Sequence, residues 1–151
     1  MRAVIQRVSH ANVVVNGGAP RAIEQGLVIL LGVRDTDTLA IVPKLAEKCA
    51  GLRIFTDSEG KLNLSAKELG YSALVVSNFT LYGNTKKGMR PSFIAAAKPP
   101  LSVEAYDLFV AEMQKHLTNV QHGEFGADMQ ITLCNDGPVT IVIDTDDWKR
   151  E

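Results

Sequence analysis

Two apolar, β-branched runs near the C-terminus, Met129–Cys134 and Val139–Ile143, do most to restrict what this chain can fold into. The residues between them, Asn135-Asp136-Gly137-Pro138, combine turn formers with a proline that has no backbone N–H and a fixed φ. The pattern predicts a β-hairpin with these residues at its tip. An ordinary Asp-Gly turn that happens to precede a proline also explains it. A second polar cluster, Ser77-Asn78-Phe79-Thr80, likewise ends a strongly apolar strand, which favours a functional explanation for both.

The composition is that of an ordinary globular protein. Its 151 residues are enough for one domain with a buried core, expected to span residues 1–151. The formal net charge is −1, so the chain lacks the basic signature of proteins that grip long nucleic acids by their phosphates. The longest apolar run, Gly26–Val33, is too short to cross a bilayer, and we expect neither a secretory signal nor a membrane partner. Cys49 and Cys134 lie in apolar segments, which predicts buried free thiols and a cytoplasmic location.

Hydrophobic periodicity predicts a fold in which strands and helices are mixed within one stack of layers. One helix has the stripe Leu45, Cys49 and Leu52 and ends near Gly51, with Pro43 close to its start. Ser102 is predicted to cap a second helix that runs to about Leu117. Its expected buried stripe is Val103, Tyr106, Val110, Met113 and Leu117. Ser65 to Glu68 fits a capping box that opens a short helical turn. The other expected strands are Arg2–Val8, Asn12–Val15, Leu27–Val33, Leu52–Phe55, Leu74–Val76 and a piece around Val120.

Cationic side chains stand out in two places. Arg7 lies on the first predicted strand, where it either points to a partly buried subunit or substrate surface or turns back to solvent as an edge-strand charge. The loop after Tyr82 carries Lys86, Lys87 and Arg90, followed by Phe93. Positive charge beside an aromatic ring suits a few phosphates and a base, and a plain solvated loop explains the same residues.

The residues of familiar hydrolases and metal sites are missing. His10, His116 and His122 are scattered, and neither a nucleophile elbow nor a phosphate loop is present. We therefore expect no metal and no cofactor. Of the three histidines, His122 is the candidate for a general base. Any hydrolysis would otherwise use hydroxyl, amide and backbone N–H groups, with the proton acceptor supplied from elsewhere.

The two polar clusters together resemble the motif pair of the D-aminoacyl-tRNA deacylases. The first is Ser77-Asn78-Phe79-Thr80-Leu81 and the second is Asn135-Asp136-Gly137-Pro138-Val139-Thr140. Four further blocks are similar to the same family, so the resemblance runs from end to end: Met1 to Val8, Leu52 to Phe55, Arg90 to Phe93, and Phe125 to Met129.

This resemblance implies a mixed α+β fold, with β-sheets in a barrel-like or layered sandwich covered by two main helices, and a homodimer with active sites at the subunit interface. It implies hydrolysis of D-aminoacyl-tRNA, and of mischarged glycyl-tRNA, to the free amino acid and tRNA. By matched position, the catalytic pocket is formed by Ser77, Asn78, Phe79 and Thr80. Gly137 and Pro138, joined by a cis bond, reach into the partner's site and exclude L side chains. Arg7, Met129, Asn135 and Thr140 support them, and the aminoacylated 3′ end of tRNA contacts Lys86, Lys87, Arg90, Phe93 and Phe125.

One residue departs from the family pattern, which usually has Gln where this chain has Asn78. The shorter amide keeps its donor and acceptor but retracts them by one C–C bond. Two alternatives therefore stay open. Beside a D-aminoacyl-tRNA deacylase, the chain could be a catalytically weak module that binds RNA ends, or a small-molecule esterase that uses Ser77 or Thr80 with His122 as base.

Overall fold

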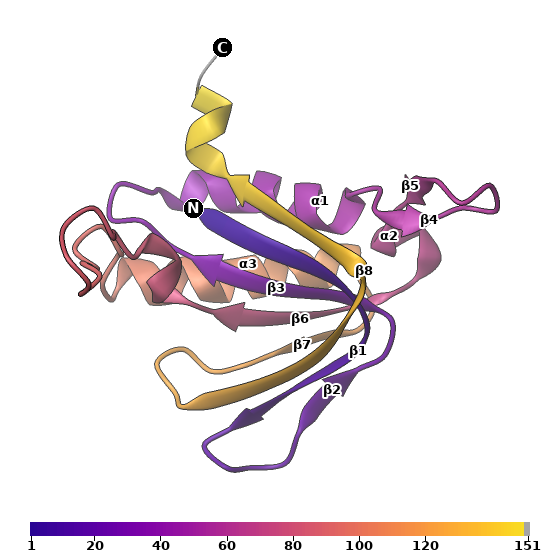
Figure 1. Cartoon of the computed structure of the whole chain (residues 1–151), viewed down its shortest axis with the longest axis horizontal. Helices are drawn as coiled ribbons and strands as arrows, with labels where there is room; N and C mark the ends of the chain where they lie inside the picture. The colour runs from indigo at the N-terminus through magenta and orange to yellow at the C-terminus, as the bar shows by residue number, and fades with distance from the viewer. Residues whose placement is uncertain (150–151) are drawn as a thin grey trace.

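The computed structural model describes residues 1–149, and the last two residues of the expected 1–151 domain lie outside that range. One curved sheet organises the chain (Figure 1). Its strand order is β2-β1-β3-β6-β7, and β8 pairs with β1 as well. The β3–β6 and β6–β7 pairs are parallel and the remaining pairs are antiparallel. The strands are β1 (Arg2–Val15), β2 (Arg21–Ile23), β3 (Gly26–Gly32), β6 (Ser72–Ser77), β7 (Val120–His122) and β8 (Met129–Asp144).

The other elements are short except for two helices. A separate two-stranded sheet consists of β4 (Phe55–Thr56) and β5 (Leu62–Leu64). The helices are α1 (Val42–Gly51), α2 (Ala66–Leu69) and α3 (Leu101–His116), with 3-10 turns η1 (Leu39–Ile41), η2 (Phe79–Tyr82) and η3 (Thr145–Lys149). This mixed α+β architecture, with a strongly curved sheet and two main helices, confirms the predicted fold class. No helix of residues 1–149 is long and apolar enough to span a bilayer.

The predicted hairpin at residues 135–138 is wrong. β8 runs without reversal from Met129 to Asp144, antiparallel to β1 over the whole length. Gln6 pairs with Thr140 and Val8 pairs with Asn135, so one β1 residue, Arg7, faces residues 136–139. Those four residues therefore leave the ladder as a local loop, which we call the 136–139 excursion. The chain does not reverse here, because β8 pairs with β1 both before and after the 136–139 excursion.

β1 is itself longer than predicted. The sequence suggested two strands, but residues 2–15 form one strand that pairs with β2, β3 and β8. The short polar stretch near His10 is accommodated by register shifts against β8. The predicted Leu52–Phe55 strand is also wrong, because the short strand β4 begins only at Phe55.

Two apolar clusters hold the sheet, one on each face. Ile5, Ile29 and Val75 face α1 and α3, whose Leu45 and Phe109 are fully buried in the same cluster. Val8, Val13, Val28, Leu74 and Val76 fill the inside of the curve. Strands buried on both faces explain the unbroken apolar runs of β3 and β6.

The two long helices bury most of the residues of the predicted stripes, but Leu52 lies just after the end of α1 and is half-buried. Pro43 occupies the first turn of α1, where its missing N–H costs nothing. α3 begins at Leu101 with Pro100 at the N-cap position, so Ser102 does not cap it and is buried inside. Val103 is half-buried, and Phe109 takes the larger share of the core. The capping box at α2 is confirmed by reciprocal bonds between Ser65 and Glu68.

Cys49 is a buried free thiol, as predicted, whereas Cys134 is exposed. Cys134 lies on β8 opposite His10 of β1, and both residues are exposed. Met1 closes the opposite end of the strand pair. Its buried ammonium group donates to Asp37 Oδ1 (2.7 Å) and Thr145 Oγ1 (2.6 Å).

Candidate functional site

The Ser77–Thr80 cluster forms a tight turn at the carboxyl end of β6. The N–H of Asn78 donates to Leu31 O on β3 (2.8 Å), which fixes the end of β6 beside its neighbour. The Asn78 Oδ1 atom accepts bonds from Thr80 N (3.2 Å) and from Thr80 Oγ1. Asn78 is thus the side-chain cap of η2, a position in which Asn is favoured over the longer Gln.

The other end of this turn is anchored by Arg2. Its Nη1 donates to Leu81 O (2.7 Å), and Nε and Nη2 donate to Asp144 Oδ2 on β8 (3.2 and 2.9 Å). The guanidinium carbon also lies 4.8 Å from the ring centroid of Tyr82. The strands β1 and β8 therefore hold η2 in place through one side chain.

The loop after η2 brings Phe93 back onto the turn. The Phe79 and Phe93 rings meet edge to face at 5.2 Å, and Phe79 is 56% exposed, a large exposed fraction for an aromatic ring. Lys86 and Arg90 are exposed on the same loop, as is Lys87. Phe93 therefore contacts the turn, whereas the predicted cationic contacts Lys86, Lys87 and Arg90 lie on the exposed part of the loop.

A narrow hollow of about 20 Å³ opens beside the turn. It is lined by Leu31, Val33, Ser77, Asn78, Phe79, Ala97, Ser102, Tyr106 and Phe125. Phe125 was expected near this site and lies there, packed edge to face on Tyr106 at 6.3 Å. Sequence reasoning missed Ser102 and Tyr106. Only the packing of α3 against β6 reveals them, because their spacing matches an ordinary helix.

Tyr106 and Ser102 give the hollow its polar groups. The Tyr106 hydroxyl donates towards Val75 O (3.0 Å) and Gly123 O (3.2 Å), and burial raises the pKa of Tyr106 above its ordinary value. Tyr106 therefore stays a neutral donor that ties β6 to the segment after β7. The Ser102 Oγ atom is buried and makes no hydrogen bond within residues 1–149. A buried hydroxyl without a partner is costly, which marks it as a group able to meet a ligand.

Arg7 belongs to a second group of residues, around the 136–139 excursion. Its side chain is only 12% exposed, so it does not turn back to solvent. Nε donates to Asp136 O (2.8 Å), and Nη1 donates to Ile54 O (3.0 Å) and Thr56 Oγ1 (3.2 Å). The guanidinium therefore fastens the excursion to the strand β4.

The excursion is braced from inside by Asn135. Its Oδ1 accepts the N–H of Val139 (2.8 Å), and its Nδ2 donates to Val139 O (3.2 Å) and Thr140 Oγ1 (3.1 Å). The Gly137–Pro138 bond is cis and Gly137 has φ +145°. A Cβ atom at Gly137 would lie 2.8 Å from Val139 N and Cγ2, so only glycine fits there.

The structure does not bring the two groups together within one chain. Leu31 pairs with both Ser77 and Ala3, whereas the excursion faces Arg7, four residues further along β1. Four residues and three strand spacings correspond to about 20 Å along the sheet. Figure 1 shows the end of β6 and the bend of β8 at opposite ends of the sheet. Met129 lies against Gly123, next to β6 and not beside Gly137.

His122 shows no sign of acting as a base for the turn. Its Nδ1 donates to Gly123 O (2.7 Å), and its ring lines a separate cavity of about 330 Å³ behind Phe125. Neither Ser77 nor Thr80 makes a hydrogen bond to His122 in the described part of the chain. Among those same residues, no group of three or more His, Cys, Asp or Glu side chains is placed to hold a metal ion.

Comparison with known proteins identifies relatives over nearly the whole length. The family model described as D-Tyr-tRNA(Tyr) deacylase matches residues 4–144. A protein of Chloroflexus aurantiacus named D-aminoacyl-tRNA deacylase is 57% identical over 145 residues, covering 96% of this chain and 91% of that protein. One of the same name from Akkermansia muciniphila is 52% identical over 152 residues and covers both chains completely.

A solved structure has the same fold. The protein described as c-Myc DNA Unwinding Element Binding Protein is 37% identical, with a TM-score of 0.88 over 95% of this chain and 98% of that one.

Proposed function

The chain belongs to the D-Tyr-tRNA(Tyr) deacylase family, and on that premise we propose that it hydrolyses the ester bond of D-aminoacyl-tRNA in the cytoplasm. One observation supports the detailed mechanism most strongly. The 136–139 excursion is rigidly held, yet it lies about 20 Å from the Ser77–Thr80 turn of its own chain. A site that needs both groups requires a second copy of the chain, so the active enzyme is a homodimer.

The reaction is a simple ester hydrolysis at the Ser77–Thr80 turn. Water attacks the ester carbonyl carbon, the bond from that carbon to the ribose oxygen breaks, and the ribose oxygen takes a proton. The free amino acid and the tRNA then leave. Since no side-chain base of residues 1–149 is hydrogen-bonded to Ser77 or Thr80, the neighbouring hydroxyl of the terminal ribose assists the attack.

The developing oxyanion is stabilised by a backbone donor of the turn. The N–H of Thr80 is already bonded to Asn78 Oδ1, whereas the N–H of Phe79 makes no hydrogen bond within residues 1–149. A preorganised donor of this kind contributes about 3–4 kcal/mol in systems where one was removed.

The Gly137–Pro138 dipeptide of one copy selects chirality in the site of the other. Main-chain atoms placed where an L side chain would project reject every such side chain, whatever its identity. A D side chain points away, and glycine has none, so glycyl-tRNA is also accepted. Arg7, Asn135 and Thr140 act as positioning residues for this dipeptide through the hydrogen bonds described above.

The 3′ end of the tRNA enters along the exposed side of the turn. Phe125 and Phe93 offer faces to the terminal adenosine, and Lys86, Lys87 and Arg90 lie on the loop that would meet its phosphates. A site that reads one nucleotide and a small aminoacyl group needs few phosphate contacts, which agrees with a net charge of −1.

Deacylation of D-tyrosyl-tRNA and L-tyrosyl-tRNA tests the activity. We expect rapid release from the D form only, and equal rates, or no release from the D form, would contradict the proposal. Tight binding of a non-hydrolysable D-aminoacyl-adenosine without turnover of the ester would favour the RNA-end binding module. His122→Ala serves as a control, because it would abolish activity only if His122 were the base.

Mixed dimers test the exchange of the dipeptide between subunits. Phe79→Pro removes the backbone donor of the turn, and Pro138→Ala alters the filter. A dimer with one chain of each kind has a single working turn, which faces the intact filter of the other chain. We therefore expect D-selective activity from the mixed dimer once it is separated from the two homodimers, for example by different affinity tags on the two chains. Activity without selectivity would show that each filter serves its own chain.

A further inference from the structure

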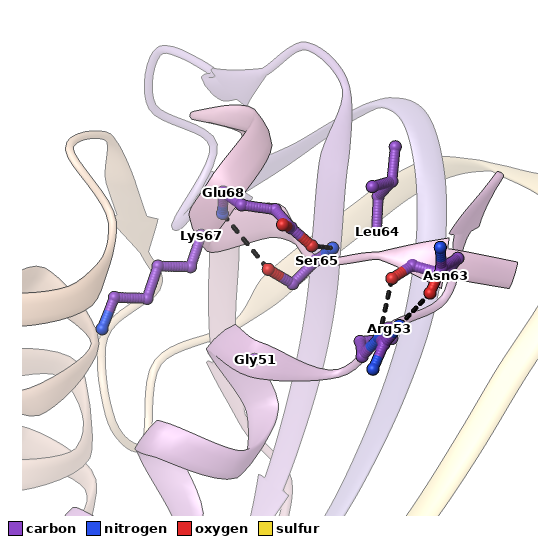
Figure 2. A pocket seen from close by; sticks show the side chains of 7 residues that line it. All are labelled: Gly51, Arg53, Asn63, Leu64, Ser65, Lys67 and Glu68. Atoms are coloured by element: carbon purple, nitrogen blue, oxygen red, sulfur yellow. Dashed lines mark hydrogen bonds between the residues drawn. The ribbon is translucent and has the colours of Figure 1, made fainter. Parts of the chain in front are cut away.

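A long groove lies at the C-terminal end of α1, on the part of the molecule that carries β4 and β5. It consists of a recess of about 630 Å³ and a neighbouring one of about 470 Å³, which share Gly51 and Arg53. Figure 2 shows the first recess, in which Gly51 lies between Arg53 on one side and Lys67 of α2 on the other. We call these two recesses the α1-end groove. It plays no part in the mechanism described above.

Cations without carboxylate partners line this groove. Lys48, Arg53 and Lys67 are all exposed, and none of them makes an ion pair within residues 1–149. Lys67 Nζ lies 3.2 Å from His116 Nδ1, so the Lys67 ammonium group is at the far side of the groove from Arg53. Of the fifteen Arg and Lys side chains of residues 1–149, seven form ion pairs with carboxylates, and the eight that do not fall into two groups. Four line the groove (Lys44, Lys48, Arg53 and Lys67), and four lie on the segment between η2 and α3 (Lys86, Lys87, Arg90 and Lys98). Positive charge left unpaired on a protein of net charge −1 indicates an anionic partner.

The acidic residues of the groove do not cancel this charge. Glu68 Oε1 is held by the N–H of Ser65 (2.7 Å), and Figure 2 shows its side chain folded back over the cap. Glu47 is the other acid, and it lines the same recess as Lys44 and Lys48 without forming an ion pair within residues 1–149. The four cations of the groove, Lys44, Lys48, Arg53 and Lys67, therefore outnumber its two acids.

Arg53 is preorganised to bind an oxyanion. Its Nε donates to Asn63 O (2.8 Å) and its Nη2 donates to Asn63 Oδ1, while Asn63 Nδ2 donates in turn to Asp57 Oδ2 (3.1 Å). These bonds fix the orientation of the guanidinium group, and its Nη1 atom makes no hydrogen bond within residues 1–149. A fixed guanidinium edge that loses little entropy on binding suits a phosphate.

The groove is linked to the 136–139 excursion through the Arg7 side chain. Ile54, the residue after Arg53, accepts a bond from Arg7 Nη1 (3.0 Å), and Arg7 Nε holds Asp136 O (2.8 Å), directly before Gly137. In the dimer proposed above, this filter is inserted into the catalytic site of the second copy. In that dimer, the groove of the first copy belongs to the same subunit as the filter that enters the second site, so it is a candidate contact for the tRNA outside that site.

We propose that the α1-end groove binds backbone phosphates of the tRNA acceptor stem while the aminoacyl end lies in the catalytic site of the other subunit. This inference rests on the proposed function. Each subunit then contributes both the filter and a phosphate-binding surface to its partner's substrate.

A charge series at Gly51 tests the groove. A Cβ atom at Gly51 meets nothing within 4 Å, so side chains can be added there without repacking. Gly51→Glu places a carboxylate in the groove, and Gly51→Gln is the matched neutral control. We expect KM for D-tyrosyl-tRNA to be about tenfold higher for the Glu variant than for the Gln variant at low salt, with equal kcat. Gly51→Lys should lower KM below that of the Gln variant.

Removal of two groove lysines gives an independent measurement. Lys48→Gln/Lys67→Gln should reduce the slope of log KM against log salt by about 1 per lysine. The rise in KM between 50 and 200 mM salt then becomes about tenfold smaller. Lys115→Gln/Lys149→Gln removes the same charge from two ion-paired lysines outside the groove, and should leave the slope unchanged.

Failure of the groove and failure of the enzyme activity are distinguishable. If the wild type deacylates D-tyrosyl-tRNA but KM is the same for the three Gly51 variants, the groove proposal is overturned and the activity stands. Binding of an uncharged acceptor-stem hairpin, followed by fluorescence anisotropy, does not require turnover. If the hairpin binds with the expected order Lys, Gln, Glu but no ester is cleaved, the groove stands and the enzymatic proposal fails. Hairpin affinities that do not follow the charge at residue 51 would also overturn the groove.

Discussion

Replacing Arg7 by alanine should damage chiral selection more than it damages folding or ester cleavage. Arg7 donates three hydrogen bonds, to Asp136 O, Ile54 O and Thr56 Oγ1, and so fastens the 136–139 excursion to β4. It lies about 16 Å along the sheet from the Ser77–Thr80 turn of its own chain, four residues and two strand spacings away. Its loss therefore acts on the filter and not directly on the reacting ester.

The size of the effect follows from the bond to Asp136 O. This is the one hydrogen bond of Arg7 to the excursion itself, and a bond to a charged group contributes about 1.5–3 kcal/mol. Its removal lowers the population of the held conformation by about 10- to 150-fold relative to loosened ones. We therefore expect the ratio of kcat/KM for D-tyrosyl-tRNA over L-tyrosyl-tRNA to fall at least tenfold. Arg7→Lys should give an intermediate ratio, because a single ammonium cannot reach three separated acceptors.

The assay measures both kcat/KM values together with thermal unfolding for Arg7→Ala, Pro138→Ala and the double variant. Pro138→Ala should itself leave a folded dimer that discriminates poorly. If Arg7 works only by orienting the dipeptide, the double variant discriminates no worse than Pro138→Ala alone. An Arg7→Ala enzyme with a wild-type D-to-L ratio would refute the reasoning. Equal losses for both substrates with a large fall in Tm would show that Arg7 is merely structural.

Three further predictions concern other parts of the molecule. Asn78→Gln removes the side-chain cap of η2 and should lower the free energy of unfolding, measured by calorimetry, by about 1 kcal/mol. Because the Asn78 oxygen already accepts hydrogen bonds from Thr80, kcat/KM should change less than tenfold. A larger gain in kcat/KM would show that the longer amide contacts the substrate. Burial raises the pKa of the Cys49 thiol to about 12, and only the thiolate reacts with iodoacetamide. At pH 8 the reagent should therefore label the exposed Cys134 but not Cys49 in the folded protein, which mass spectrometry of the peptides measures. Asp37→Asn leaves the buried N-terminal ammonium without its charged partner and should cost about 3–5 kcal/mol in urea unfolding, so a cost below 1 kcal/mol would contradict the importance of this pair.

Elements whose burial follows from local periodicity could be predicted from the sequence, and those decided by distant partners could not. The stripe of α1 and the apolar runs of β3 and β6 are visible residue by residue because each is buried along its own length. The path of β8 is different. Asn-Asp-Gly-Pro has the composition of a reversing turn, but the partner that decides the outcome is β1, which begins more than a hundred residues earlier.

The candidate site divides in the same way. The Ser77–Thr80 turn and the residues around Gly137 are contiguous in sequence, so their polar character could be recognised. Ser102 and Tyr106 occupy ordinary helical positions, and their role at the hollow depends on how α3 packs against β6. Local sequence showed where polar groups interrupt the apolar pattern, but it did not show which helix faces them.

The separation of filter and catalytic turn has a consequence for fidelity. A single chain carries the turn, the hollow and the aromatic rings, but its own filter is held at the far end of the sheet. An isolated protomer would then have no main-chain barrier against L-aminoacyl-tRNA, which is in large excess during translation. Under the proposed mechanism, discrimination would depend on association of two subunits, and because Arg7 and Asn135 already hold residues 136–139 in one chain, association would not cost the entropy of ordering them. A phosphate-binding groove on the same subunit as that filter reinforces this arrangement, because the tRNA would contact both subunits whenever its ester is in place.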